Sequence, residues 1–160
     1  MAGLLDQFRN KILSTVYKEN TQDSQSNQIN DRIALGVLLR VVAEADEKFL
    51  PEEKQKIEEI LKDYGRISTE EIPLIMETVK QAAAERIDLY RFTHEISDGL
   101  RYPVKISILE NLFRIACADN DLDNSELEMI RKISGLLGVD HKDFISAKIS
   151  IKKEFGLETV

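Results

Sequence analysis

The sequence has few of the residues that make turns, cross-links or membrane spans. Seven Gly and three Pro among 160 residues are too few for a turn-rich all-β fold. Cys117 is the single cysteine, so no intramolecular disulfide can form and a reducing compartment is expected. No apolar run approaches the ~18–20 residues of a membrane span, and Met1 to Leu5 do not begin a secretory signal. These absences predict a soluble, cytoplasmic protein.

The chain also lacks a basic surplus. Its formal net charge is −7, whereas nucleic-acid phosphates attract clustered Lys and Arg. Nucleic acid is therefore excluded as a main partner. The nearest basic cluster is Lys148, Lys152 and Lys153, and we interpret it as a solvated helix face.

What the chain does have is helical periodicity. Apolar residues make up 42% and charged residues 32%, typical of one folded domain. We expect an N-terminal amphipathic helix over residues 4–19 and a polar connector over 20–27, together forming an N-terminal part of residues 1–29. A helical domain is expected over residues 30–160. The first helix is compatible with packing on the core or with contacting a membrane surface or a protein partner.

Two of the expected helices are apolar on nearly every side. They cover about residues 30–46 and the stretch from Pro103 to Ala116, and helices of this kind lie in the interior of a protein. Gly65 and Gly138 are expected to end helices. The remaining helices are expected to begin near Pro51, Ser68, Asp88, Ser125 and Asp140, with capping-box spacing at Ser68/Glu71 and Ser125/Glu128.

An internal repeat relates the two apolar helices and the segment after each of them. A shift of 73 residues aligns Ala45-Asp46 with Ala118-Asp119 and aligns Glu53 with Glu126. Shared helical periodicity alone does not produce an ungapped Ala-x-Ala-Asp followed seven residues later by Glu. We interpret the pattern as a duplicated unit of buried helix, acidic corner and amphipathic helix.

The two corner segments also carry a family resemblance. Residues 42–53 (VAEADEKFLPEE) and 115–126 (IACADNDLDNSE) resemble the two signature segments of TerB-like domains, and the likeness covers roughly residues 30–150. The same fold occurs at the N-terminus of membrane-anchored DnaJ-like chaperones. The resemblance implies a compact all-α bundle of about seven or eight helices with an acidic surface. It implies a link to tellurite or stress resistance and no established reaction.

The acidic corners are the candidate functional site. The family positions match at Asp46, Glu53, Asp119 and Glu126, and the second corner adds Asp121 and Asp123. Hard cations such as Mg²⁺ and Ca²⁺ bind several carboxylate and carbonyl oxygens together. The run is not an EF-hand, because Ile130 stands where a bidentate Glu is required. The first corner has Lys48 and Leu50 where the second has Asp121 and Asp123, which argues against equal metal binding at both.

Three uses of these acids are compatible with the sequence. Two carboxylates ~5 Å apart repel by ~3 kcal/mol at an effective dielectric of 20, so facing corners in a cleft would recruit a cation or hold a proton. Acids that point into solvent would serve as helix caps, each contributing ~1 kcal/mol or less. The acids would also suit an acidic docking face for a basic protein partner.

The sequence contains no complete catalytic motif. His94 and Glu95 begin a zinc-protease-like motif, but Asp98 replaces the second His. Cys117 lies between two alanines at a buried helix end, which is typical of an inert core thiol. We therefore expect no enzyme. The leading hypothesis is a TerB-like module that binds a divalent cation at its corners, and the alternative is a metal-free adaptor or co-chaperone-like domain that recruits proteins through its first helix or its acidic face.

Overall fold

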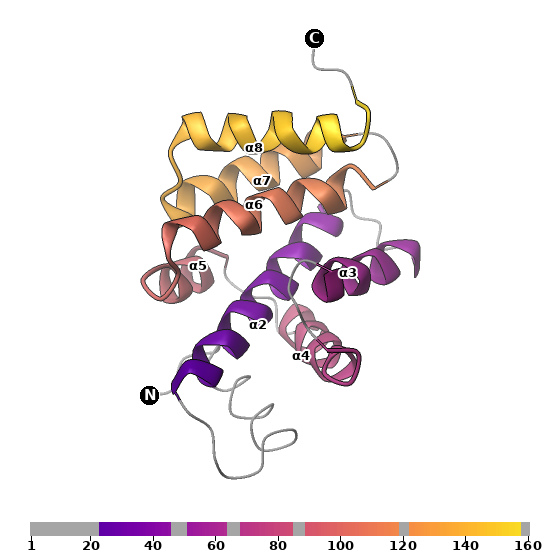
Figure 1. Ribbon diagram of the computed structural model, residues 1–160, viewed down its shortest axis with the longest axis vertical. Helices are drawn as coiled ribbons and strands as arrows, with labels where there is room; N and C mark the ends of the chain where they lie inside the picture. Colours follow the sequence, from indigo (N-terminus) through magenta and orange to yellow (C-terminus); the bar gives the residue numbers. More distant parts are fainter. Residues whose placement is uncertain (1–22, 46–50, 64–67, 85–88, 119–121, 158–160) are drawn as a thin grey trace.

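The computed structural model describes residues 23–45, 51–63, 68–84, 89–118 and 122–157. All regular secondary structure in these ranges is α-helical, which confirms the predicted fold class. The expected helix over residues 4–19 lies outside the described residues. The helices are α2 (Asp23–Ala43), α3 (Pro51–Asp63), α4 (Ile72–Ala84), α5 (Leu89–Ser97), α6 (Tyr102–Ala116), α7 (Asn124–Leu137) and α8 (His141–Glu154) (Figure 1).

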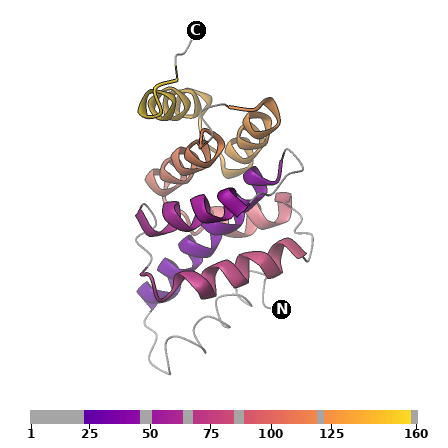
Figure 2. The same cartoon turned by 90° about the vertical axis from the view of Figure 1, so that its right-hand side faces the viewer.

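The two apolar helices, α2 and α6, pack on each other at the centre of the molecule (Figures 1 and 2). Both were predicted to be interior, and both are. Burying a large aliphatic side chain contributes about 1.5–3 kcal/mol, so this crossing holds a large part of the folding free energy. The side chains exposed by 1% or less include Ile33, Leu38, Leu39 and Val42 of α2 and Leu109, Leu112, Phe113 and Ala116 of α6.

The outer helices are placed on the central pair in a matched way. Helices α3 and α4 contact α2, and α7 and α8 contact α6. Helix α3 also contacts α6, while α7 contacts α2. Exchanging α2, α3 and α4 for α6, α7 and α8 therefore reproduces the same set of contacts. Helix α5 packs on α7 and stands outside this matched set.

Local sequence signals explain most of the helix ends. Pro51 is the first residue of α3, where its missing N–H has no partner to lose. Gly138 ends α7 in the left-handed conformation, with a φ of 76°, which glycine adopts without a steric penalty. Just before α4, Ser68 Oγ donates to Glu71 Oε1 at 3.1 Å and the Glu71 N–H donates to the Ser68 carbonyl oxygen at 3.0 Å, so the two residues are in contact but not through the hydrogen bonds of a capping box.

Two helix starts differ from the prediction. Helix α2 begins at Asp23, not near Asn30, because the polar stretch before Asn30 contains no Gly or Pro to prevent a helix. The predicted Ser125/Glu128 capping box is wrong. Asp123 is the N-cap of α7, so the box spacing falls on Asp123 and Glu126, and Glu128 forms an ion pair with Arg131 instead.

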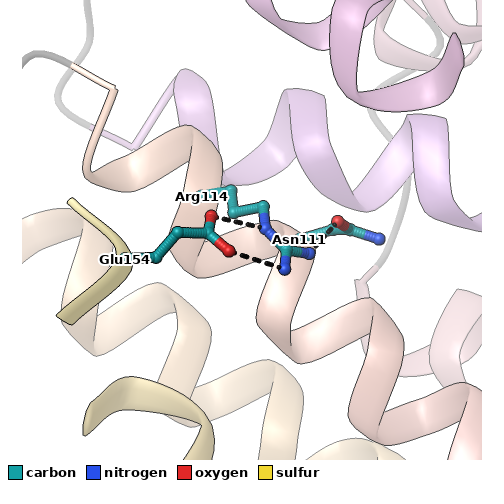
Figure 3. Close-up of polar contacts among 3 residues, drawn as sticks. All are labelled: Asn111, Arg114 and Glu154. Atoms are coloured by element: carbon teal, nitrogen blue, oxygen red, sulfur yellow. Dashed lines mark hydrogen bonds and ion pairs between the residues drawn. The ribbon is translucent and has the colours of Figure 1, made fainter. Parts of the chain in front are cut away.

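Helix α8 is fastened to α6 at both ends by polar contacts. Near its C-terminus, Arg114 donates from Nε and Nη2 to the two carboxylate oxygens of Glu154, at 2.9 and 3.1 Å (Figure 3). The same guanidinium donates from Nη1 to Oδ1 of the buried Asn111 at 2.8 Å. Near the N-terminus, Tyr102 Oη accepts from the Asp140 N–H at 3.0 Å and donates to Asp143 Oδ2 at 2.5 Å. These contacts fix which face of α8 points inward.

The crossing of α2 and α4 gives a direct test of the packing. A Cβ added at Gly36 would come within 2.8 Å of Val79 Cγ2, and Val79 is buried and stiff at χ1. We predict that Gly36→Ala lowers the free energy of unfolding by about 1–3 kcal/mol, measured by urea denaturation. Gly135→Ala is the matched control because nothing lies within 4 Å of its added Cβ, and it should stabilise by about 0.5–1 kcal/mol. Equal effects of the two changes would contradict the packing.

The contact of Tyr102 with α8 predicts a pH effect. The hydrogen bond to Asp143 raises the pKa of Tyr102 above its ordinary 10.0, and the bond from the Asp140 N–H partly opposes this. A raised folded-state pKa means that the contact stabilises the protein below pH 10 and is lost as pH rises through the folded-state pKa. Tyr102→Phe should therefore have a lower Tm than the wild type at pH 8, and the difference should shrink as the pH passes 10. A difference that stays constant across that range contradicts the assignment.

Candidate cation site at two helix corners

The two acidic corners occupy equivalent places in the helices. Helices α2 and α6 end at Ala43 and Ala116, and α3 and α7 begin at Pro51 and Asn124. Each pair of positions is 73 residues apart, the same shift that aligns the two sequence segments. Glu53 and Glu126 are therefore both the third residue of their helices.

Both glutamates are withdrawn from solvent. Glu126 is only 8% exposed, and Glu53 is half-buried with its Oε2 atom shielded from solvent. Carboxylates are rarely buried to this extent unless partners surround them. Their place in the first helical turn supplies one favourable interaction, because the N-terminus of a helix carries a partial positive charge. The fold thus buries Glu126 and shields part of the aligned Glu53 from solvent.

Asp123 has a different role in the structure. It is exposed, and its Oδ2 accepts a hydrogen bond from the Ser125 N–H at 3.0 Å as the N-cap of α7. This is the capping role that the sequence left open for the corner acids. The second carboxylate oxygen of a capping Asp can still meet another ligand, so the capping role and cation binding are compatible.

The other three predicted site residues, Asp46, Asp119 and Asp121, lie outside the described residues. Within the described ranges, no group of three or more His, Cys, Asp or Glu side chains is gathered closely enough to hold a metal ion. A complete site would therefore need the aspartates of the two connecting segments in addition to Glu53 and Glu126.

The C-terminal ends of α2 and α6 lie toward the same side of the molecule. Helices α2 and α6 both run to the right-hand side of Figure 1, which faces the viewer in Figure 2. Helices α2 and α6 contact each other, α3 contacts α6, and α7 contacts α2, so these four helices form one packed unit. The aligned glutamates therefore belong to helices, α3 and α7, that each contact both central helices.

The two histidines and the single cysteine belong to separate elements of the fold. His94 is exposed on α5 and stacks on Tyr90, with ring centroids 6.5 Å apart. Cys117 is fully buried at the end of α6, as predicted. His141 is the first residue of α8 and stacks on Phe144 with a centroid distance of 5.8 Å. The contacts described for His94 and His141 are thus ring contacts within their own helices.

Comparison with known proteins decides the family. The family described as Tellurite resistance protein TerB matches residues 32–149, which include both corners and every helix from α3 to α7. The chain belongs to the TerB family. No curated protein and no solved structure matched the chain significantly. None of the helices in the described ranges has the length and apolar character of a membrane span.

The polar contacts between helices were not predicted from the sequence. The pair Arg32–Glu71, with Nη1 and Oε2 2.6 Å apart, links α2 to the start of α4, and Arg114–Glu154 links α6 to α8. Both pairs join residues about 40 positions apart, so helical spacing carries no signal for them. Glu71 carried a local signal through its capping-box spacing, but its second partner comes from the tertiary fold.

Two substitutions distinguish the helix-capping role of Asp123 from an effect of its negative charge. Asp123→Ala should lower the free energy of unfolding by about 1 kcal/mol, whereas Asp123→Asn should cost much less because Asn caps about as well as Asp. Chemical denaturation of the two variants in EDTA checks this without any cation present. If Asn and Ala destabilise the protein equally, the carboxylate charge rather than the cap matters at this position.

Proposed function

We propose that this chain is a non-enzymatic TerB-like module of the cytoplasm that binds a divalent cation, Mg²⁺ or Ca²⁺, at its two acidic corners. The observation that carries the proposal is the equal placement of Glu53 and Glu126. Both stand at the third position of a helix, 73 residues apart, and both are withdrawn from solvent.

Internal duplication explains this placement. The matched contacts of α2, α3 and α4 with those of α6, α7 and α8 support two copies of one unit that pack through their first helices. In the sequence, Asp46 and Asp119 each come three residues after the last residue of a central helix. We infer that Asp46, Glu53, Asp119, Asp121, Asp123 and Glu126 supply the ligands, with the second corner contributing the larger share because of its additional aspartates.

The chemistry of these ligands selects the cation. All six side chains are carboxylates, which favour hard cations with several oxygen ligands. No His or Cys belongs to the proposed set, so a Zn²⁺ site of the structural type is disfavoured. Carboxylates held near each other raise the free energy of the cation-free protein, and a bound cation removes that repulsion. The link to tellurite resistance rests on the family alone.

Thermal unfolding tests cation binding. In EDTA the Tm should be lowest, and a cation at about 100 times its Kd should add about 2.7 kcal/mol, or roughly 5–10 °C for a chain of this size. Mg²⁺ or Ca²⁺ should stabilise more than Zn²⁺. Identical midpoints in EDTA and in every cation contradict the proposal.

Matched variants locate the effect. Asp119→Asn with Asp121→Asn should abolish the cation-dependent rise in Tm while leaving the protein folded in EDTA. The control is Glu70→Gln with Glu77→Gln, two exposed acids before and on α4 whose replacement changes the net charge equally. Loss of the rise in both double variants would indicate general charge screening instead of a site.

A groove between α3 and α4 favours a second candidate, a metal-free adaptor domain. The groove has a volume of about 740 Å³, with Ile72, Pro73 and Met76 on its apolar side and Lys54, Lys62 and Lys80 among its charged residues. Under this alternative the chain recruits a protein through the groove, the acidic face or the first segment. Phe8→Asp with Ile12→Asp in the full chain should then remove the partner from a pull-down, whereas an unchanged partner set excludes the first segment.

A further inference from the structure

Helix α8 presents a basic face to solvent in a protein whose net charge is −7. Lys142 and Lys153 are exposed, and Lys148 and Lys152 are half-buried. Among the described residues, none of these four lysines takes part in an ion pair. The group has no role in the corners or in the core.

The acids of α8 are turned away from this face. Asp143 and Glu154 are the two acidic residues within the helix. Asp143 accepts from Tyr102 and Glu154 accepts from Arg114, and both partners belong to α6. The contacts between α6 and α8 thus orient α8 so that its acids lie toward α6 and its lysines lie toward solvent. Asp140 and Glu154 are exposed acids at the two ends of the helix, and Glu154 is paired with Arg114 of α6.

Two isoleucines lie between the lysines. At 100° per residue, Ile145 and Ile149 lie between Lys148 and Lys152 on one flank and Lys142 and Lys153 on the other. Ile145 is half-buried and packs against the core, whereas Ile149 faces solvent. Ile149 is 37% exposed, one of the few large apolar side chains exposed to this degree among the described residues. We call Lys142, Ile145, Lys148, Ile149, Lys152 and Lys153 the α8 ridge.

We propose that the α8 ridge binds the surface of an anionic phospholipid bilayer. Helix α8 lies at the outer edge of the molecule in both views, so a flat surface can reach the whole ridge (Figures 1 and 2). The lysines extend over about 16 Å along the axis from Lys142 to Lys153. A bilayer supplies anionic headgroups to all four lysines at once, and short apolar side chains between lysines suit the boundary between headgroups and acyl chains.

An acidic peptide is the competing occupant, and the shape of the ridge favours the bilayer. The groove between α3 and α4 is lined by residues of α2, α3, α4 and the segment before α4, and by none from α8. A peptide bound to an exposed helix face can contact the protein on one side only, unlike a peptide bound in a groove. A planar bilayer needs contact on one side only. The same bilayer would repel the acidic remainder of the chain, and this repulsion orients the molecule with α8 facing the bilayer.

The expected affinity is weak and salt-dependent. Each lysine near an anionic bilayer strengthens binding by about fivefold, so four lysines give roughly millimolar affinity and a reversible contact. Raising the ionic strength shortens the Debye length to about 3 Å at 1 M salt and should release the protein.

The test is co-sedimentation of the full chain with phosphatidylcholine vesicles containing about 30% phosphatidylserine, at millimolar lipid and low salt. The chain should bind these vesicles and not pure phosphatidylcholine. Lys142→Gln/Lys152→Gln/Lys153→Gln should weaken binding by about 100-fold. Lys54→Gln/Lys62→Gln/Lys80→Gln removes the same charge from α3 and α4 and should leave binding within about threefold.

Several results would overturn the proposal. These are no binding of the wild type to phosphatidylserine vesicles, equal loss in both triple variants, or full binding by the ridge variant. Capture of the wild type by poly-glutamate beads, lost in the ridge variant and without vesicle binding, would assign the ridge to an acidic protein. Circular dichroism of both triple variants verifies that they are folded, because all six lysines lie on the surface.

Discussion

The crossing of α2 and α6 is the contact on which the rest of the structure depends. Each of these helices is apolar on nearly every side, so neither can be solvated alone, and the free energy gained by burying them together holds the fold. Helices α3, α4, α7 and α8 each pack on at least one of the two, and α5 reaches α6 through the hydrogen bond from Lys105 Nζ to Ser97 Oγ at 3.0 Å. The crossing also brings the ends of both helices to one side of the molecule, and the acidic corners begin where those helices end.

The crossing of α2 and α6 does not determine how each outer helix is rotated about its own axis, and the polar contacts do. Arg32–Glu71 and Arg114–Glu154 are both partly shielded from solvent and each joins a central helix to an outer one. Ion pairs of this kind add little net stability, but they select one rotation of the outer helix about its axis. In α8 that selection has a visible consequence, because Asp143 and Glu154 are turned toward α6 and the four lysines of α8 are left on the other side of the helix.

The sequence predicted the fold better than the site, and the reasons are physical. Apolar periodicity identified α2 and α6 as interior, and Pro51 and Gly138 marked helix ends, because these signals are local. The start of α2 was missed since its first turns are polar and carry no helix breaker. The burial of Glu126 was not predicted either. Its place in the repeat could be predicted from a 73-residue shift, but its 8% exposure depends on how α2, α6 and α7 pack. The contact of Tyr102 with Asp143 likewise joins residues 41 positions apart, which no short-range pattern can indicate.

The central claim is that two copies of one helical unit bring their carboxylates to a common cation. A titration with Mn²⁺, which accepts the same oxygen ligands as Mg²⁺, tests it directly through paramagnetic broadening of backbone amide signals. The account predicts that the amides of Glu53 and Glu126 broaden together at the same low Mn²⁺ concentration, before those of exposed acids on α4 such as Glu77. Broadening at one corner alone, or at all acidic residues in proportion to their exposure, would contradict it.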